Sequence, residues 1–132
     1  MEIIADTNVL VRAIVADDPK QAAVAQKALL DASLVAVSPI ALCELYWVLS
    51  RAYKVPDADI ETAIRGLVSA ANVCTDALAV DAGLMFMNSG GDFADGVLWH
   101  LGTTLGGKTF VSFDKKAANI LKTHKASVKL IA

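Results

Sequence analysis

The stretch EIIADTNVLV, residues 2–11, changes within a few positions from an apolar run to a helical pattern. Residues 2–5 are mostly apolar rather than alternating, which is typical of a strand covered on both faces of a parallel sheet. Residues 7–16 form the first expected helix, so Asp6 stands between a strand and a helix. This order of strand, acid and helix predicts the beginning of an α/β fold.

The alternation of strands and helices continues along the chain. Further apolar runs predict strands at residues 34–37, 72–74, 109–111 and 128–131, and the intervening patterns predict helices at residues 20–31, 38–53, 57–70, 77–87, 93–105 and 115–124. Ser38 and Pro39 have the residue types expected at the start of a helix. We therefore expect a three-layer α/β/α domain with a central, mostly parallel five-stranded sheet. Ligands bind such sheets beyond the carboxyl ends of the strands.

Length and composition indicate one folded domain over residues 1–132. The chain has 132 residues, of which 55% are hydrophobic, which is enough for a sizeable core. No apolar run approaches the roughly 20 residues of a membrane span. The N-terminus lacks a basic signal-peptide region, so we expect a cytoplasmic protein. The two cysteines, Cys43 and Cys74, lack zinc-site spacing and are expected to be free thiols.

Acidic residues stand at positions where a sheet of this kind binds its ligands. Asp6 follows the first strand and Asp114 lies three residues after the strand at 109–111, so both belong to the carboxyl-end rim. Asp92 and Asp95 are three residues apart at the start of one helix and share a face. Glu44 lies inside a helix among apolar neighbours, where an acid is costly unless it is paired or bound to a metal.

Converging carboxylates suit a divalent metal ion. Like charges raise one another's pKa values, and Mg²⁺ or Mn²⁺ relieves the repulsion because these ions prefer oxygen ligands. One or two such ions can activate water and stabilise the leaving oxygen in phosphodiester cleavage. We predict that the catalytic and metal-binding residues are Asp6, Glu44, Asp95 and Asp114. Thr7 and Asn8 directly follow Asp6 and could hold either its carboxylate or a metal-bound water.

Each acid alone also has a structural explanation. Asp6 and Asp114 could cap the helices that follow them, and a cap is the favoured role of Asp92. Glu44 cannot be a cap, so its alternative is a buried ion pair with an arginine such as Arg12 or Arg51.

Other residues give weaker signals. His100 and His124 show no spacing that supports metal-free cleavage by acid–base catalysis. Trp47 and Trp99 are expected to be core residues rather than platforms for nucleotide bases.

Lysines gather towards the C-terminus although the net charge is −2. Six of the twelve basic residues lie in the last 25 positions, beside a single acid, Asp114. Such lysines could hold a phosphate backbone, and Lys108, Lys115 and Lys116 are the candidates for RNA contacts. The alternative is a solvated helix surface.

Four stretches resemble the ordered motifs of PIN domains. IADTNVL at residues 4–10 resembles the first motif, an Asp followed by Thr-Asn after strand one. SPIALCEL at residues 38–45 resembles the second, with its acid inside a helix. DFADG at residues 92–96 resembles the third in its VapC-like form, although Gly96 stands where alanine is more usual. TFVSFDKK at residues 109–116 resembles the fourth.

The resemblance implies a function. PIN domains are α/β nucleases, and VapC-type members are toxins of toxin–antitoxin pairs that cleave RNA, often transfer or ribosomal RNA, with Mg²⁺ or Mn²⁺. They commonly form homodimers and are neutralised by a small VapB-like antitoxin, whose DNA-binding part links the complex to DNA only indirectly. Carried over by position, Asp6, Glu44, Asp95 and Asp114 form the acidic site. Asp92 and Asn8 match supporting residues.

Two alternatives remain at this stage. A haloacid-dehalogenase-like phosphatase would use Asp6 as a nucleophile after strand one. That family has a second Asp where this chain has Asn8, and it would not explain Glu44. The second alternative is an inactive PIN-like interaction module, against which the retention of all four motif acids argues.

Overall fold

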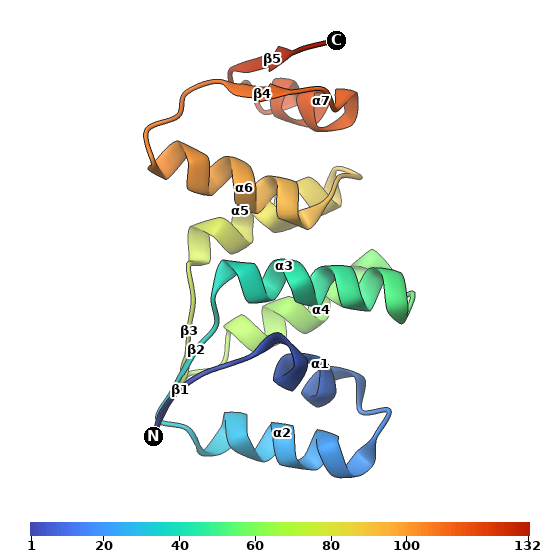
Figure 1. The fold of residues 1–132 in the computed structure, drawn as a ribbon, viewed down its shortest axis with the longest axis vertical. Coiled ribbons are helices and arrows are strands. Elements are labelled where there is room, and N and C mark those ends of the chain that lie inside the picture. Colours follow the sequence, from blue (N-terminus) through green and yellow to red (C-terminus); the bar gives the residue numbers. More distant parts are fainter. The chain divides into compact units, whose positions relative to one another are not determined.

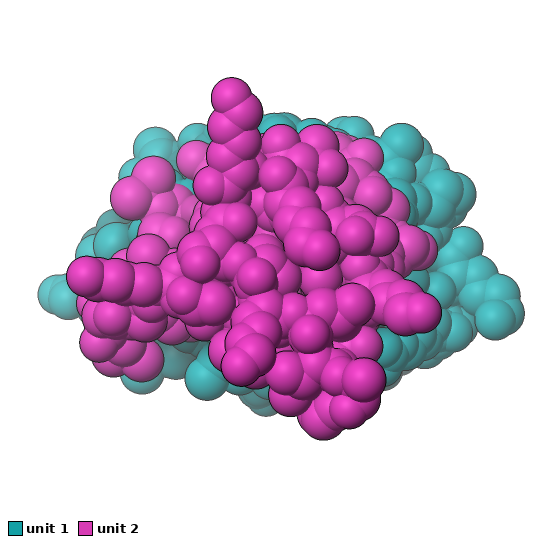
Figure 2. All heavy atoms as spheres, turned by 90° about the horizontal axis from the view of Figure 1, so that it is seen from above, with its two compact units in different colours: residues 1–77 teal, residues 78–132 magenta.

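The strands and helices expected from the sequence are present in the computed structural model, which describes all 132 residues (Figure 1). In chain order they are β1 (Glu2–Ile4), α1 (Thr7–Val15), α2 (Pro19–Asp31), β2 (Leu34–Ala36), α3 (Pro39–Trp47), η1 (Val48–Ala52), α4 (Asp57–Val68), β3 (Val73–Cys74), α5 (Ala77–Asn88), α6 (Phe93–Thr104), β4 (Phe110–Ser112), α7 (Lys115–Thr123) and β5 (Val128–Leu130). They divide into two units, residues 1–77 and 78–132, which are coloured separately in Figure 2.

The first unit contains a parallel sheet in the order β1-β2-β3. Val35 of the middle strand β2 lies between Ile3 and Val73, and its side chain is fully buried. Helix α1 packs against α2 and α3. Leu10 of α1 and Leu42 of α3 are completely buried, so the apolar residues that repeat along these helices form the core of the unit.

Helix starts in the first unit follow the expected capping chemistry. The Ser38 hydroxyl accepts a hydrogen bond from the Ala41 amide at 3.2 Å, and Pro39 occupies the first helical position. Pro19 likewise begins α2, where the Asp18 carboxylate accepts bonds from the amides of Lys20 and Gln21.

The expected helix over residues 38–53 changes type along its length. Its first part is α3, and its last turn, η1, is a π-helix in which the Tyr53 amide bonds to the Val48 carbonyl at 3.2 Å. The chain then reverses at Lys54, whose φ is 52°. Nothing in the apolar spacing distinguishes a π-turn from the α-helix that it continues.

The second unit contains a two-stranded parallel sheet, β4-β5, with α5, α6 and α7. Its core includes Phe86, Ile120 and Leu121, and Trp99 packs against this cluster with its ring 6.4 Å from that of Phe86. Trp99, expected to be a core residue, is thus partly buried against the edge of the core.

Helices α5 and α6 approach one another through glycines. A Cβ atom on Gly96 would overlap the backbone carbonyl of Ala82, and one on Gly83 would lie 2.6 Å from the Phe93 ring. Gly96 thus serves close packing of the two helices, and this explains the departure from alanine at that position.

The α/β class and the parallel pairing of all strands are confirmed, but the prediction of a single five-stranded sheet is wrong. The structure has a three-stranded and a two-stranded sheet, because β1 pairs only with β2 and β4 pairs only with β5. Apolar runs identify strands but do not identify which edges exchange hydrogen bonds. No helix has both the length and the apolar character needed to cross a membrane.

Candidate active site

Asp6 follows the carboxyl end of β1, as predicted. Pairing with β2 continues as far as Ala5, whose amide donates to the Ala36 carbonyl at 3.0 Å. Asp6 is exposed and precedes the first residue of α1, but its side chain accepts no capping hydrogen bond. The capping explanation of Asp6 is therefore wrong, and its carboxylate is available for another role.

Glu44 is the outward-facing acid of α3. Its sequence neighbours Cys43 and Leu45 are buried, yet Glu44 itself is exposed, so its charge does not bear the burial cost expected from the flanking residues. The Thr7 hydroxyl donates a hydrogen bond to Glu44 Oε1 at 3.4 Å and links the start of α1 to α3. Thr7 therefore supports Glu44, whereas the sequence suggested that it could hold either Asp6 or a metal-bound water.

An ion pair does not explain Glu44. The Arg12 guanidinium bonds to Asp17 Oδ1 at 3.1 Å, and the hydroxyl of Tyr53 donates to the other oxygen of Asp17 at the same distance. The Arg51 guanidinium lies over the Trp47 ring, 5.5 Å from its centroid. Neither arginine pairs with Glu44, and that alternative is wrong.

In the second unit, the acids of DFADG lie at the start of α6. The Asp92 carboxylate accepts a hydrogen bond from the Ala94 amide at 2.8 Å, which confirms Asp92 as the helix cap. Asp95 is half-buried in the first turn. Burial raises the pKa of Asp95, and the neighbouring charges of Asp92 and Asp114 raise it further. Three acids from two separate motifs are thus close enough to interact.

The Asp114 carboxylate caps α7 with one oxygen and leaves its other oxygen without a capping bond. Its Oδ1 accepts bonds from the amides of Lys116 at 2.9 Å and Ala117 at 3.2 Å, which confirms the capping explanation. Both bonds fall on the same oxygen, so Oδ2 can still bind a cation. The Asp114 amide donates to the hydroxyl of Ser112 at 2.9 Å. Sequence reasoning missed Ser112, although a serine two residues before an acid is a common local backbone partner.

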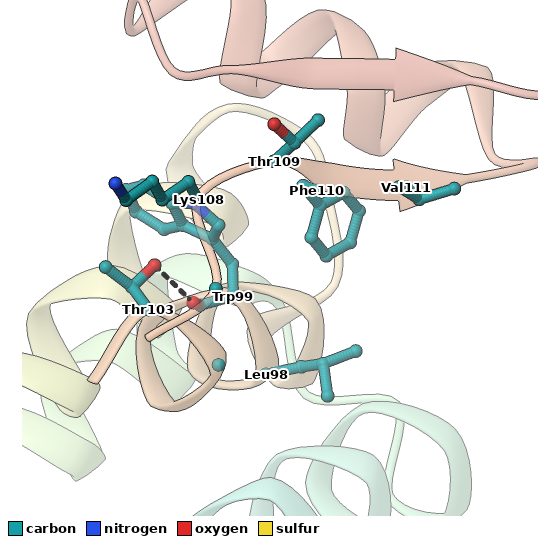
Figure 3. A pocket seen from close by; sticks show the side chains of 9 residues that line it. Leu98, Trp99, Thr103, Lys108, Thr109, Phe110 and Val111 are labelled. Atoms are coloured by element: carbon teal, nitrogen blue, oxygen red, sulfur yellow. Dashed lines mark hydrogen bonds between the residues drawn. The ribbon is translucent and has the colours of Figure 1, made fainter. Parts of the chain in front are cut away.

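The supporting polar residues are more scattered than expected. Asn8 is exposed and lines a groove between α1 and α2, and it makes no hydrogen bond to Asp6. Lys108 lines a cavity of about 210 Å³ between α6 and β4, next to Trp99 and Phe110 (Figure 3). Lys108 thus lies at the amino end of β4, whereas Asp114 and the exposed Lys115 and Lys116 follow its carboxyl end.

The acidic residues have the chemistry that a divalent ion requires but do not form a ready cage. Neither unit gathers three metal-binding side chains into one metal site. Mg²⁺ needs no such cage, because it usually binds one or two carboxylates and completes its shell with waters and substrate phosphates. Burial is the main cause of the raised pKa of Asp95, and the charges of Asp92 and Asp114 add to it; a cation would relieve the repulsion among these charges. The residues of the second unit therefore fit Mg²⁺ or Mn²⁺.

These features define an α/β protein with acids at the carboxyl ends of β1 and β4 and a carboxylate group at the start of α6. A comparison with protein families identifies the class, because the PIN domain family matches residues 3–122. The chain belongs to the PIN domain family. PIN domains are generally nucleases that typically use divalent metals. A comparison with curated proteins gives no match.

Family membership replaces the phosphatase alternative, and the four motif acids all lie within the matched residues. In the second unit the charges of Asp92 and Asp114 reach Asp95, and in the first unit a hydrogen bond joins Thr7 to Glu44. That all four motif acids act in one reaction remains a prediction.

Proposed function

We propose that this chain is a Mg²⁺- or Mn²⁺-dependent endoribonuclease that hydrolyses RNA phosphodiester bonds. Asp6, Glu44, Asp95 and Asp114 are the catalytic acids, and Asp92, Thr7 and Asn8 support them. The observation that carries the proposal is the match of residues 3–122 to a nuclease family, within which the charges of Asp92 and Asp114 reach Asp95 from separate stretches of the chain. Neighbouring carboxylates repel one another, and a bound cation relieves that repulsion.

Each acid has a defined task in this proposal. When bound, a divalent ion would supply an activated water and stabilise the leaving oxygen. Asp95 and Asp114 would hold the ion, and the amides that bond to Asp114 Oδ1 fix that carboxylate so that Oδ2 is presented in one orientation. The Thr7 hydroxyl limits the rotamers of Glu44, and Asp6 keeps an unbonded carboxylate.

We also propose that the nuclease is a VapC-type toxin of a type II toxin–antitoxin pair, acting in the cytoplasm as a homodimer. Support comes from the DFADG motif and from the order of the four motifs. Its partners would be the RNA substrate and a VapB-like antitoxin, with DNA bound only through the antitoxin.

The nuclease proposal is tested with purified, antitoxin-free protein on total RNA. We expect cleavage with Mg²⁺ or Mn²⁺, none in EDTA, and a loss of at least about 100-fold in Asp6→Asn. Asp59→Asn is the matched control, since it removes the same charge from an exposed position at the start of α4. Persistent cleavage in EDTA, or equal activity of Asp6→Asn, would refute the metal mechanism.

The toxin proposal needs a cellular readout. Expression of the wild-type chain should arrest growth, and Glu44→Gln should relieve the arrest while the purified variant keeps the wild-type unfolding temperature. Arrest by Glu44→Gln at the wild-type level would contradict the role of Glu44. If the purified wild-type chain cleaves no RNA with either metal, the inactive interaction module becomes the better account.

A further inference from the structure

A polar groove of about 590 Å³ lies along α7 in the second unit. It is lined by Ser89, Lys116, Asn119, Ile120 and Thr123. Ile120 forms its apolar base and is only 6% exposed, while the four polar residues are exposed. The groove therefore presents four polar side chains at the surface above one buried apolar residue.

The turn between α5 and α6 forms the groove with α7. A Cβ atom on Gly91 would lie 2.6 Å from Ile120 Cδ1 and 3.2 Å from the Phe86 carbonyl oxygen, so the glycine leaves room for the turn to lie close to Ile120 of α7. The preceding Gly90 adopts a φ of 85°, which also favours glycine. The two glycines thus set the course of the turn beside the groove.

Each side of the groove is adjacent in sequence to one of the acids Asp92 and Asp114. The turn that carries Ser89 leads directly to Asp92, the cap of α6. On the other side, Lys116 follows Asp114, and its amide donates to Asp114 Oδ1. A strand of RNA whose phosphate lies at Asp95 and Asp114 would therefore enter this groove with its adjacent nucleotides.

The chemistry of the groove fits a nucleic-acid backbone. Lys116, Asn119 and Thr123 are spaced at i, i+3 and i+7, so they line one face of α7. They offer a cation, an amide and a hydroxyl, which are groups that contact phosphate and ribose oxygens. No acid lines the groove, and residues 96–132 contain six lysines against one acid. An apolar peptide anchor would find little surface here, because Ile120 is buried.

We propose that this groove binds the RNA backbone beside the bond that the acids cleave, with Lys116 contacting a phosphate. This inference rests on the proposed nuclease function and adds the path of the substrate to it. Ser89, Asn119 and Thr123 contact the sugar and phosphate oxygens without reading sequence.

The test compares Lys116→Ala with Lys122→Ala in the full-length chain. Lys122 is on the same helix but six residues away, on a different face, and does not line the groove. Binding of a short, fluorescently labelled single-stranded RNA of mixed sequence is measured by anisotropy in EDTA over a range of salt concentrations. Lys116→Ala should weaken binding about threefold to tenfold and reduce the slope of log K against log salt by about 0.7. Lys116→Arg should restore both values.

Cleavage kinetics separate the failure of this inference from the failure of the proposed function. With Mg²⁺, Lys116→Ala should raise KM while kcat stays near the wild-type value. Unchanged RNA binding, or an equal loss in Lys122→Ala, would overturn the groove proposal even if the wild-type chain cleaves RNA. Weaker binding of an acidic peptide with unchanged RNA binding would assign the groove to a protein partner and would also overturn it. Absence of cleavage by the wild-type chain would refute the nuclease function, while the binding data would still decide the groove.

Discussion

Replacement of Gly96 by alanine should destabilise the protein. A Cβ atom at this position would overlap the Ala82 carbonyl oxygen and would lie 2.7 Å from its carbon and 2.9 Å from Gly83 Cα. These atoms are all backbone, so no side-chain rotation can relieve the overlap and α6 must move away from α5. Overpacking of this kind costs about 1–3 kcal/mol, against which alanine gains up to about 1 kcal/mol in helix propensity. We expect a net loss of about 1–2 kcal/mol.

Urea unfolding followed by circular dichroism measures this loss. With a slope of about 2 kcal/mol per molar urea, the unfolding midpoint of Gly96→Ala should fall by about 0.5–1 M. Gly66→Ala is the matched control, because Gly66 is an exposed residue of α4 where an added Cβ would meet no atom within 4 Å, and its midpoint should rise. A Gly96→Ala midpoint equal to or above that of the wild-type chain would refute the argument from helix packing.

Two further predictions concern the acids of the second unit. Because burial and the charges of Asp92 and Asp114 raise the pKa of Asp95, the folded chain loses stability as pH rises through that raised pKa. In EDTA at pH 7, Asp95→Asn should therefore unfold at a higher temperature than the wild-type chain. This difference in unfolding temperature should vanish below the ordinary pKa of aspartic acid, and an unchanged difference at low pH would contradict the prediction. Asp114→Asn should lose activity but keep the helix cap, whereas Asp114→Ala should also lose about 1 kcal/mol of stability in urea unfolding. Equal stability of the two Asp114 variants would show that the cap contributes nothing.

Local signals in the sequence predict most of the elements correctly. Pro19, Ser38 and the turn at Gly90 and Gly91 act through backbone chemistry within a few residues, so the helix starts and breaks that they indicate are present. The sheet arrangement depends on hydrogen bonds between distant segments. The apolar character of β1 and β4 does not specify which strand pairs with which edge, and the five-stranded sheet was therefore predicted wrongly.

The same distinction applies to the candidate site. The position of Asp6 after β1 follows from local order, and the proximity of Asp95 to Asp92 follows from helical spacing. The exposure of Glu44 and its bond to Thr7 could not be predicted, because they depend on how α1 packs against α3. The sequence also does not show whether an acid that caps a helix keeps an oxygen for a metal ion. At Asp114 this depends on the fact that both amide bonds fall on a single oxygen.

The most direct test of the central claim is the rate at which the antitoxin-free protein cleaves RNA as Mg²⁺ is titrated from an EDTA-treated start. The wild-type rate should begin at the uncatalysed level and rise to saturation, and the Asp95→Asn rate should stay at that level throughout. The two curves share the same RNA, buffer and protein concentration, so they differ only in the proposed metal ligand. A wild-type rate independent of Mg²⁺, or an Asp95→Asn curve that follows the wild-type curve, would contradict the account.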